Sequence, residues 1–579
     1  MGSISDATAL HGTAYVLGQA SGKLLAGNLE ISFWGGVNRE TGEIVDHHHP
    51  LNGQFLPGCI LAIPGGRGSC SGSSALLELI MNGKGPSAFI FERREEILTL
   101  GVMIAEEVFQ RSIPVVVLSP EKFKNLLSLN GSFLYIQDGI VSTGQGELAP
   151  KHHGASIQSK VQLSELDKTF LSGKHGEASR VAMRLIVRMA DLLGAQNLVD
   201  VTQVHVDGCI YTGPACLSFA NRFREWGAKV RVPTSLNSIS VDRKRWKSHG
   251  VDTEFAQAAE ALADAYVAMG ARPTYTCAPY QLDSAPQLGD QVAWAESNAV
   301  VYANSVLGAR TMKYPDFLDI CVALTGRAPN GGPHIDLYRK ATLRVEVSEV
   351  KLSATDDSFW SLLGYCIGLL SGNSIPAVTG LESSKPSNDD LKAFGAAFAT
   401  VCSSPMFHIV GVTPEAASVE GALSSTYSSL TVGRNELVNC WKDLSKAPSG
   451  AHIGLVSLGN PHFSFPEIRQ LAGLCQGRRR SKDVTVMVTC SRAIYGLADQ
   501  AGLVAQLEGF GVQFLTDICW CMITESTVPR EAKVVMTNSA KYAHYGPDLI
   551  GREFLFGSLA ACVEAACTGV GDRKQPSWL

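Results

Sequence analysis

The sequence predicts an α/β protein with a small β/α domain followed by a large α/β region built on parallel sheets. Short apolar runs alternate with glycine-marked turns and helical stretches, which is typical of a repeating strand, turn and helix. Charged residues make up 18% of the 579 residues, below the typical ~25%, and 57 residues are glycine. Such a composition favours a large enzyme with an extensive buried core over a disordered or nucleic-acid-binding chain. The length favours several domains.

The first predicted domain covers residues 1–148. Apolar runs at residues 58–64 and 113–118 are typical of strands that flank a helix. A polar, glycine-marked stretch over residues 142–154 predicts a linker. We therefore place the small domain at residues 1–148 and the large region at residues 160–579.

The large region begins with a strongly helical stretch, residues 163–194, and then repeats strand, turn and helix, with a strand expected at residues 228–232. Four predicted strands of the last third run into polar loops: 453–458, 484–488, 512–515 and 533–536. Ligands gather at the carboxyl ends of parallel strands. The Cys, Asn, Ser, His and Lys residues of these loops therefore indicate a site.

A serine- and glycine-rich segment, residues 64–74, lies between a predicted strand and a predicted helix of the small domain. Glycines allow the backbone to approach a ligand closely, and the amides at a helix start favour negative charge. A serine held there could have its alkoxide stabilised and act as a base. The alternative is a phosphate-binding or purely structural turn, although the segment lacks the lysine and spacing of a P-loop.

This segment, together with several others, resembles the aconitase X family. The matching stretches follow the family order over nearly the whole chain: 46–53, 64–74, 205–211, 276–280, 303–311, 412–416 and 537–545. The order resembles the fused, single-chain form. The resemblance implies an aconitase-like multidomain fold, with a small swivelling domain followed by the large domain.

The resemblance also implies an activity. The fused form is associated with dehydration of cis-3-hydroxy-L-proline to Δ1-pyrroline-2-carboxylate, and the two-subunit form with dehydration of phosphorylated mevalonate. Such a hydro-lyase must remove a weakly acidic α-proton and expel hydroxide, which calls for a base and a Lewis-acidic iron. The alternatives are the same chemistry on another hydroxy acid, phosphomevalonate-like or from specialised metabolism, and a non-catalytic homologue without a cluster.

By position in the family motif, Ser69 is the expected base, with Arg67 and Ser71 as its neighbours. Ser71 is the alternative base, because the spacing alone does not rank the two serines.

The family's cofactor is an iron–sulfur cluster, with 2Fe-2S favoured here. The fifteen cysteines are an odd number spread over a long chain, so they indicate reduced thiols rather than a disulfide framework. The resemblance assigns Cys277 and Cys519 as ligands. Some relatives have Gly-Cys-Pro-His where this chain has Asn460 in the second position, so Cys490 is the expected third ligand, with Cys402 next.

The remaining predictions concern substrate and surroundings. Backbone groups of Gly208, Cys209 and Ile210, and the side chains of Asn237, Ser539 and Lys541, are expected to bind the substrate, and His544 is expected either to shuttle a proton or to be structural. The net charge of −5 is too small to steer a polyanion, and the longest apolar stretch, residues 359–370, is shorter than the ~20 residues of a membrane span. Because residues 1–12 carry no secretory signal, we expect a cytoplasmic monomer or small homo-oligomer that binds a small hydroxy acid and neither nucleic acid nor membrane.

Overall fold

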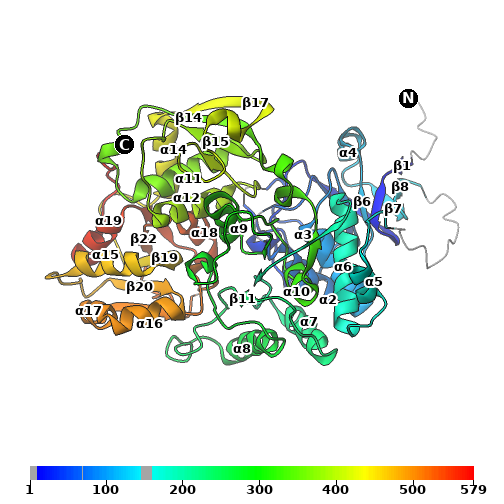
Figure 1. The fold of residues 1–579 in the computed structure, drawn as a ribbon, viewed down its shortest axis with the longest axis horizontal. Coiled ribbons are helices and arrows are strands. Elements are labelled where there is room, and N and C mark those ends of the chain that lie inside the picture. Colours follow the sequence, from blue (N-terminus) through cyan, green and yellow to red (C-terminus); the bar gives the residue numbers. More distant parts are fainter. Residues whose placement is uncertain (1–8, 48, 68–69, 145–158, 524) are drawn as a thin grey trace. The chain divides into compact units, whose positions relative to one another are not determined.

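The computed structural model describes residues 9–47, 49–67, 70–144, 159–523 and 525–579, and it confirms an α/β fold (Figure 1). The chain passes back and forth between two compact units. Unit 1 comprises Met1–Val201, Thr212–Val232 and Tyr314–Gly331, and unit 2 comprises Thr202–Tyr211, Pro233–Lys313 and Gly332–Leu579. In the part of the chain that is described, no helix is both long and apolar enough to cross a bilayer.

Unit 1 contains an eight-stranded mixed sheet in the order β1-β8-β7-β3-β4-β5-β6-β2. Its centre is parallel: β3 (Gln19–Ala26), β4 (Cys59–Ile63), β5 (Ala88–Phe91) and β6 (Val115–Val117). The outer strands pair antiparallel: β1 (Leu10–His11), β2 (Thr13–Val16), β7 (Phe133–Gln137) and β8 (Ile140–Ser142). Helix α2 (Gly72–Met81) follows β4 and packs against α3 (Ile97–Phe109), so the described residues of the serine-rich segment, 64–67 and 70–74, lie between the carboxyl end of a central parallel strand and the first turn of α2.

The helical stretch predicted at residues 163–194 forms two helices, α5 (Glu165–Leu171) and α6 (Glu177–Leu193). Gly173 and Gly176 separate them, both in the left-handed region that favours glycine. Arg327, on β13 (Arg327–Pro329), donates through Nε to Oδ1 of Asp167 at 2.8 Å. The Asp167 carboxyl is fully buried, so this ion pair ties the start of α5 to β13 inside unit 1.

The strand predicted at residues 228–232 is wrong. These residues form an irregular segment held by a bond from the Arg231 N–H to the Ala323 carbonyl at 2.7 Å. The strand begins beyond Pro233, which has no N–H to donate, as β11 (Thr234–Leu236). In unit 2, β11 flanks β10 (Val204–Val206) in a parallel three-stranded sheet completed by β12 (Ala293–Trp294).

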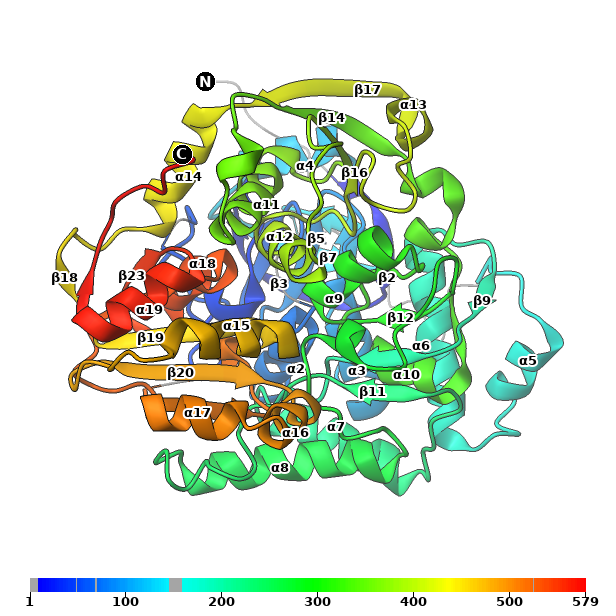
Figure 2. The ribbon, with the colours of Figure 1, turned by 60° about the vertical axis from the view of Figure 1, so that its left-hand side comes forward.

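The last third of the chain forms a parallel five-stranded sheet in the order β21-β20-β19-β22-β23. Its strands are β19 (Leu455–Phe463), β20 (Thr485–Cys490), β21 (Val512–Thr516), β22 (Val534–Thr537) and β23 (Glu553–Phe556). Four of them correspond to the four strands predicted there. Figure 2 shows α15 (Phe465–Cys475) and α19 (Leu559–Thr568) beside β19. An apolar core joins this sheet to α15, α19, α16 (Arg492–Gln500) and α17 (Leu503–Phe510).

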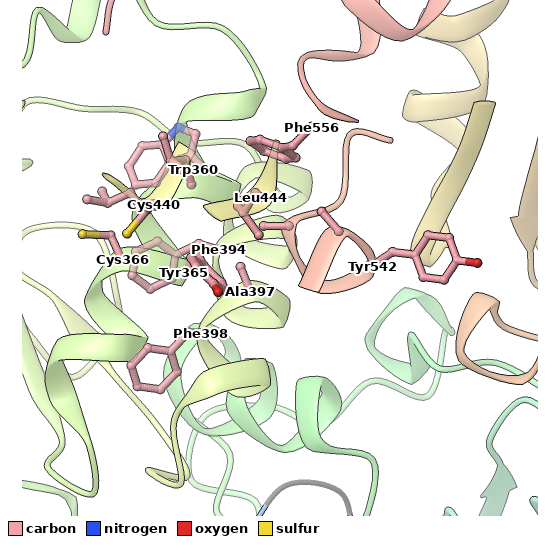
Figure 3. Packing of buried hydrophobic residues seen from close by; sticks show 14 of the residues in the cluster. Trp360, Tyr365, Cys366, Phe394, Ala397, Phe398, Cys440, Leu444, Tyr542 and Phe556 are labelled. Atoms are coloured by element: carbon pink, nitrogen blue, oxygen red, sulfur yellow. The ribbon is translucent and has the colours of Figure 1, made fainter. Parts of the chain in front are cut away.

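A second apolar core joins the five-stranded sheet to a parallel four-stranded sheet of unit 2. The four-stranded sheet has the order β16-β15-β14-β17: β14 (Ala341–Val347), β15 (Pro376–Thr379), β16 (His408–Ile409) and β17 (Leu423–Val432). Helices α11 (Ser358–Ser371) and α12 (Asn388–Val401) pack against each other in this core. Figure 3 shows part of it, with Trp360 and Tyr365 of α11 near Phe394 and Phe398 of α12.

Candidate functional site

The candidate site of unit 2 is built where the strands of its parallel sheets end. The predicted strand 453–458 continues to Phe463 as β19, but its pairing with β20 shifts between Leu458 and Phe463. Gly459 makes this irregularity possible because its φ is 92°, and a Cβ there would meet the Thr489 carbonyl oxygen at 2.1 Å. The segment of Asn460, a cis Pro461 and His462 therefore leaves the regular ladder.

Cys277 is bound to this segment from a different loop. Its sulfur accepts a hydrogen bond from the His462 N–H at 3.3 Å, and its carbonyl accepts one from the Asn298 side-chain amide at 3.0 Å. Burial, followed by the neighbouring Cys519, raises the pKa of Cys277. The raised pKa means that a further positive charge, such as a bound metal ion, is needed to hold this thiol as a thiolate.

Cys519 and Cys521 follow β21 on one short turn. The hydrogen bond between their side chains, together with burial, raises the pKa of Cys519, and the same bond lowers the pKa of Cys521 to about 7. Between them, the Trp520 indole donates to the Leu458 carbonyl at 2.7 Å and so anchors the turn to β19. We refer to Cys277, Cys519 and Cys521 as the thiol site.

Lys541 supplies a positive charge to the thiol site. It lies in the first turn of α18 (Ala540–Ile550), and its ammonium donates to Oε1 of Glu296 at 3.0 Å. Burial alone would lower the pKa of Lys541, but Glu296 and the three thiol groups outweigh it and raise the pKa. Burial alone would likewise raise the pKa of Glu296, but Lys541 and the Ala299 N–H lower it. Lys541 is therefore charged and electrostatically coupled to every sulfur of the thiol site.

Two polar side chains complete these surroundings. The amide of Asn460 donates to the sulfur of Cys521 at 3.7 Å, and the Ser539 hydroxyl donates to the Asn460 carbonyl. Ser539 is also the N-cap of α18, since its oxygen accepts from the Tyr542 N–H at 3.2 Å. The structure thus gathers Cys277, Cys519, Ser539 and Lys541, as well as Asn460, from loops far apart in the sequence.

The described interactions of Cys490 and Cys402 are with other partners. Cys490 ends β20 and is buried in the apolar core with α15 and α19, where its charged neighbours are Arg245, Asp242 and Asp517. The Cys402 thiol donates to the Gly372 carbonyl at 2.9 Å. The interactions described for the thiol site include neither cysteine.

The loop after β10 contains Gly208, Cys209 and Ile210, whose backbone groups are predicted to bind the substrate. The Ile210 N–H donates to the Asp207 carbonyl at 3.2 Å, and the Cys209 thiol donates to the Asn237 carbonyl at 3.4 Å. The Asn237 amide is bonded to the Asp207 carboxylate. Ser238, the next residue, hydrogen-bonds Cys519 and lowers the pKa of that thiol against the stronger effects that raise it. Gly208, Cys209 and Ile210 thus lie on the loop after β10, which is bonded to Asn237 on the segment after β11, and Ser238 of that segment contacts the thiol site.

His544 lies on an exposed side of α18. The Tyr365 hydroxyl lies 3.0 Å from Nδ1 of His544, and the two rings pack with their centroids 5.7 Å apart. This contact agrees with the structural alternative for His544.

In unit 1, Ser69 lies outside the described residues. Ser71 is the N-cap residue of α2 and is buried, and its carbonyl accepts from the Ser74 hydroxyl at 2.9 Å. Ser74 also donates to Oδ2 of the buried Asp316 at 2.9 Å, which ties the first turn of α2 to a distant segment of the chain. Arg67 is half-exposed and pairs with Asp46 at 2.7 Å.

Sequence reasoning missed Cys521 and Glu296. Cys521 stands two positions from Cys519, and that spacing was the only signal available in the sequence. Glu296 stands two residues after β12 and caps α9 (Ser297–Tyr302), since its carboxylate accepts from the Ala299 N–H at 2.9 Å. An acidic residue between an apolar run and a helix is most often only a cap, so it does not single out a site.

The thiol site fits a metal centre by the chemistry of its donors. Among the residues that the structure describes, no group of three or more His, Cys, Asp or Glu side chains is arranged to hold a metal ion. The thiols are instead bonded to one another, to Asn460 and to the His462 N–H. The buried thiols of Cys277 and Cys519 and the half-buried thiol of Cys521, beside a lysine, nevertheless form a donor set that suits iron. Thiolate sulfur is the usual ligand of iron–sulfur centres.

Comparison with known families accounts for most of the chain in four consecutive parts. The matches are the aconitase X swivel domain at residues 9–142, first domain at 160–337, second domain at 341–442 and third domain at 453–568. The chain belongs to the aconitase X family. Cys277 lies in the first-domain match, and Cys519 and Cys521 lie in the third-domain match.

Individual aconitase X relatives match over long stretches. The chain is 57% identical over 578 residues to a cis-3-hydroxy-L-proline dehydratase of Hypocrea jecorina, covering 98% of this chain and 97% of the relative. It is 49% identical over 570 residues to the protein of the same name from Pseudomonas aeruginosa, covering 97% of each. A phosphomevalonate dehydratase large subunit of Methanothermobacter thermautotrophicus is 34% identical over 399 residues, covering 69% of this chain and 96% of the relative.

A solved structure agrees with this family. The crystal structure of Thermococcus kodakaraensis aconitase X in its holo form matches with a TM-score of 0.63 and 30% identity, covering 70% of this chain and all (100%) of that chain. Because the aconitase X relatives are dehydratases, this chain is a carbon–oxygen lyase, specifically a hydro-lyase.

Proposed function

We propose that this aconitase X chain dehydrates cis-3-hydroxy-L-proline to Δ1-pyrroline-2-carboxylate. The observation that carries the proposal is the 57% identity to a cis-3-hydroxy-L-proline dehydratase over 98% of the chain. The phosphomevalonate dehydratase large subunit, at 34% identity, covers only 69% of the chain, which supports that substrate less well.

The proposed reaction breaks two bonds of the substrate. A base removes the proton at C2, and the electron pair of that C–H bond forms a C2–C3 double bond as the C3–O bond breaks. The hydroxide leaves as water after taking up a proton. The resulting enamine then tautomerises: nitrogen loses its proton, C3 gains one, and the double bond moves to N and C2 to give the cyclic imine. The first step requires a base, and the departure of hydroxide requires a Lewis acid or a proton donor.

We propose Ser69 as the base, with Arg67 and Ser71 beside it in the motif and Ser71 as the alternative. Support comes from the start of α2, a helix of ten residues whose first amides favour a negative charge in the serine-rich segment. The bonds of Ser74 to the Ser71 carbonyl and to Asp316 keep this first turn rigid. The pKa of a serine must be lowered a great deal before it can act as a base. Backbone amides held in fixed positions at a helix start stabilise the alkoxide and so lower that pKa.

We propose that Cys277, Cys519 and Cys521 hold an iron–sulfur centre, with 2Fe-2S favoured, and that Cys521 takes the place for which the sequence nominated Cys490. The support for Cys521 is its bond to Cys519, the donor from Asn460, and its coupling to Lys541. When bound, the centre supplies a Lewis acid for the departing hydroxyl group. Lys541, held by Glu296, balances the negative charge of the thiolates.

Substrate binding is proposed for the backbone of Gly208, Cys209 and Ile210 and for Asn237 and Ser539. Lys541 is the proposed partner of the substrate carboxylate, since it is a buried cation that is coupled to the thiol site. His544 is proposed as a structural residue. We further propose a cytoplasmic monomer or small homo-oligomer that acts on a small molecule and binds neither nucleic acid nor membrane.

The substrate is tested with iron-loaded protein, prepared anaerobically and offered a panel of hydroxy acids. The panel comprises cis-3-hydroxy-L-proline, trans-3-hydroxy-L-proline and mevalonate 5-phosphate, and mass spectrometry detects the loss of water. We expect the cis isomer to give the highest kcat/KM. Turnover of mevalonate 5-phosphate with none of cis-3-hydroxy-L-proline would overturn the substrate assignment but retain the hydro-lyase.

A further inference from the structure

The two loops that carry the thiol site share an unusual backbone feature. Tyr275 has a φ of 43° and stands two residues before Cys277, and Asp517 has a φ of 70° and stands two residues before Cys519. Residues other than glycine uncommonly adopt the left-handed region, and a bulky tyrosine persists there only when its surroundings hold it. Each turn lies two residues before a cysteine of the thiol site, so its backbone angles contribute to the direction in which the chain reaches that cysteine.

Arg492 touches both left-handed residues. Its guanidinium donates through Nε and Nη2 to the two carboxylate oxygens of Asp517, at 2.8 and 2.9 Å. The same guanidinium lies over the ring of Tyr275, with Cζ at 4.6 Å from the ring centre. Asp517 is 1% exposed, so one arginine joins a buried carboxylate on one cysteine loop to a buried aromatic face on the other.

The position of Arg492 in its own helix does not explain its presence. It is the first residue of α16, and the positive end of a helix dipole disfavours a cation in the first turn. Ser491 already caps the helix by accepting from the Ile494 N–H at 3.2 Å. A planar guanidinium that makes a forked bond and stacks at once is also a geometry that lysine does not reproduce.

Tyr275 is held from its hydroxyl end as well. Arg243 donates to the Tyr275 hydroxyl at 3.2 Å and pairs with Asp264 at 2.7 Å. The ring is therefore fixed at its edge by Arg243 and on its face by Arg492, while only Arg492 also reaches Asp517.

We propose that Arg492 is a positioning residue that fixes Cys277 and Cys519 relative to each other by clamping the left-handed turns at Tyr275 and Asp517. The proposal rests on the proposed function in one respect, namely that the thiol site holds a metal. Residues that orient metal ligands from outside the coordination shell typically contribute about 10–100-fold to metal affinity. In this proposal the clamp holds Cys277 and Cys519 in place before the metal binds.

The test is an anaerobic titration of the iron-free, full-length protein with Co(II), whose thiolate charge-transfer and visible bands report the ligand set. We expect Arg492→Lys to bind Co(II) about 10–100-fold more weakly than the wild type, with shifted visible bands. The matched control is Arg478→Lys, which makes the same exchange in a surface ion pair with Glu564, and it should bind as the wild type does. Wild-type affinity and bands in Arg492→Lys would overturn the clamp. Absence of thiolate bands in the wild type itself would overturn the metal centre, and the clamp with it.

A second pair of variants keeps the test decisive if Arg492→Lys does not fold. Tyr275→Leu removes the aromatic face, and Tyr275→Phe keeps the face while losing the hydroxyl. We expect Tyr275→Leu to lose Co(II) affinity and Tyr275→Phe to retain most of it, with thermal unfolding of the iron-free proteins confirming that both are folded. Equal Co(II) binding by the two folded variants would overturn the stacking half of the clamp.

Discussion

The side-chain amide of Asn460 donates a hydrogen bond to the sulfur of Cys521 at 3.7 Å. The family resemblance implies a cysteine at the position of Asn460 in some relatives, so this contact joins a departure from that implied pattern to a thiol of the thiol site. The sulfur missing from position 460 is thus matched by a sulfur on the neighbouring turn. This relationship makes Cys521, rather than Cys490, the proposed third ligand.

We predict that Cys521→Ser lowers the iron content of anaerobically reconstituted protein to well below half of the wild-type value, because a hydroxyl is a poor ligand for iron–sulfur centres. The matched control is Cys490→Ser, a change in the apolar core of the same sheet, which should retain iron. Iron per chain and visible absorption measure the effect. Loss of iron in Cys490→Ser with retention in Cys521→Ser would return the ligand role to Cys490.

We predict that Gly459→Ala destabilises the protein by at least about 2 kcal/mol, since alanine must enter the left-handed region and its Cβ must displace the Thr489 carbonyl. Gly473→Ala is the control, because Gly473 is an exposed residue of α15 with open space around it. That change should stabilise the protein by about 0.5–1 kcal/mol. Urea unfolding measures both, and a neutral Gly459→Ala would show that the irregularity of β19 does not need glycine.

We predict a pH-dependent stability from the Arg327–Asp167 pair of unit 1. Burial alone would raise the pKa of Asp167, but the hydrogen bonds of Arg327 and Ser164 outweigh it and lower the pKa. The unfolded chain therefore takes up this proton first as the pH falls. The contribution of the pair to the free energy of unfolding is complete above about pH 5, and it is lost as the pH falls through the unfolded pKa and then the lowered folded pKa.

At neutral pH, Asp167→Asn should cost about 3 kcal/mol, because it leaves a buried charge without its main partner. The variant should also flatten the fall in stability between about pH 5 and pH 3. Asp200→Asn removes an exposed partner of the same arginine and should cost at most about 1 kcal/mol. Urea unfolding across this pH range would contradict the assignment if Asp167→Asn retained the wild-type slope.

We predict that Ser69→Ala lowers kcat at least about 100-fold while the iron content stays unchanged, as expected for a general base that does not bind the metal. Ser71→Ala is the companion variant, and it should keep a larger share of the activity. If Ser69→Ala remains active and Ser71→Ala does not, the base is Ser71.

Much of the candidate site could be predicted from the sequence because apolar runs indicate strands. The polar residues that follow each run indicate the carboxyl end of the strand. Cys277, Cys519, Ser539 and Lys541 were nominated in this way or by resemblance, and the structure gathers them. The apolar pattern does not predict whether the residue at the end of a strand faces the site or the apolar core. Cys490 is the last residue of β20 and turns into the apolar core, whereas Cys521 stands beyond β21 on a turn that Trp520 fixes to β19.

Other features depend on contacts between distant residues. The strand expected at residues 228–232 had the right composition, but Pro233 sets the start of β11 after it. His544 stands three residues from Lys541 on α18, yet Tyr365 of α11 holds its ring on the exposed side. Neither Glu296 nor Arg492 carries a local signal, since each acts through partners more than twenty residues away.

The central claim is that iron held by the thiol site is required for water loss from cis-3-hydroxy-L-proline. The most direct measurement compares formation of Δ1-pyrroline-2-carboxylate by iron-loaded protein, by the same protein stripped with a chelator, and by stripped protein resupplied anaerobically with iron and sulfide. We predict product from the loaded protein, none from the stripped protein, and recovery on resupply. Equal turnover by loaded and stripped protein, or no product from the loaded protein, would contradict the claim.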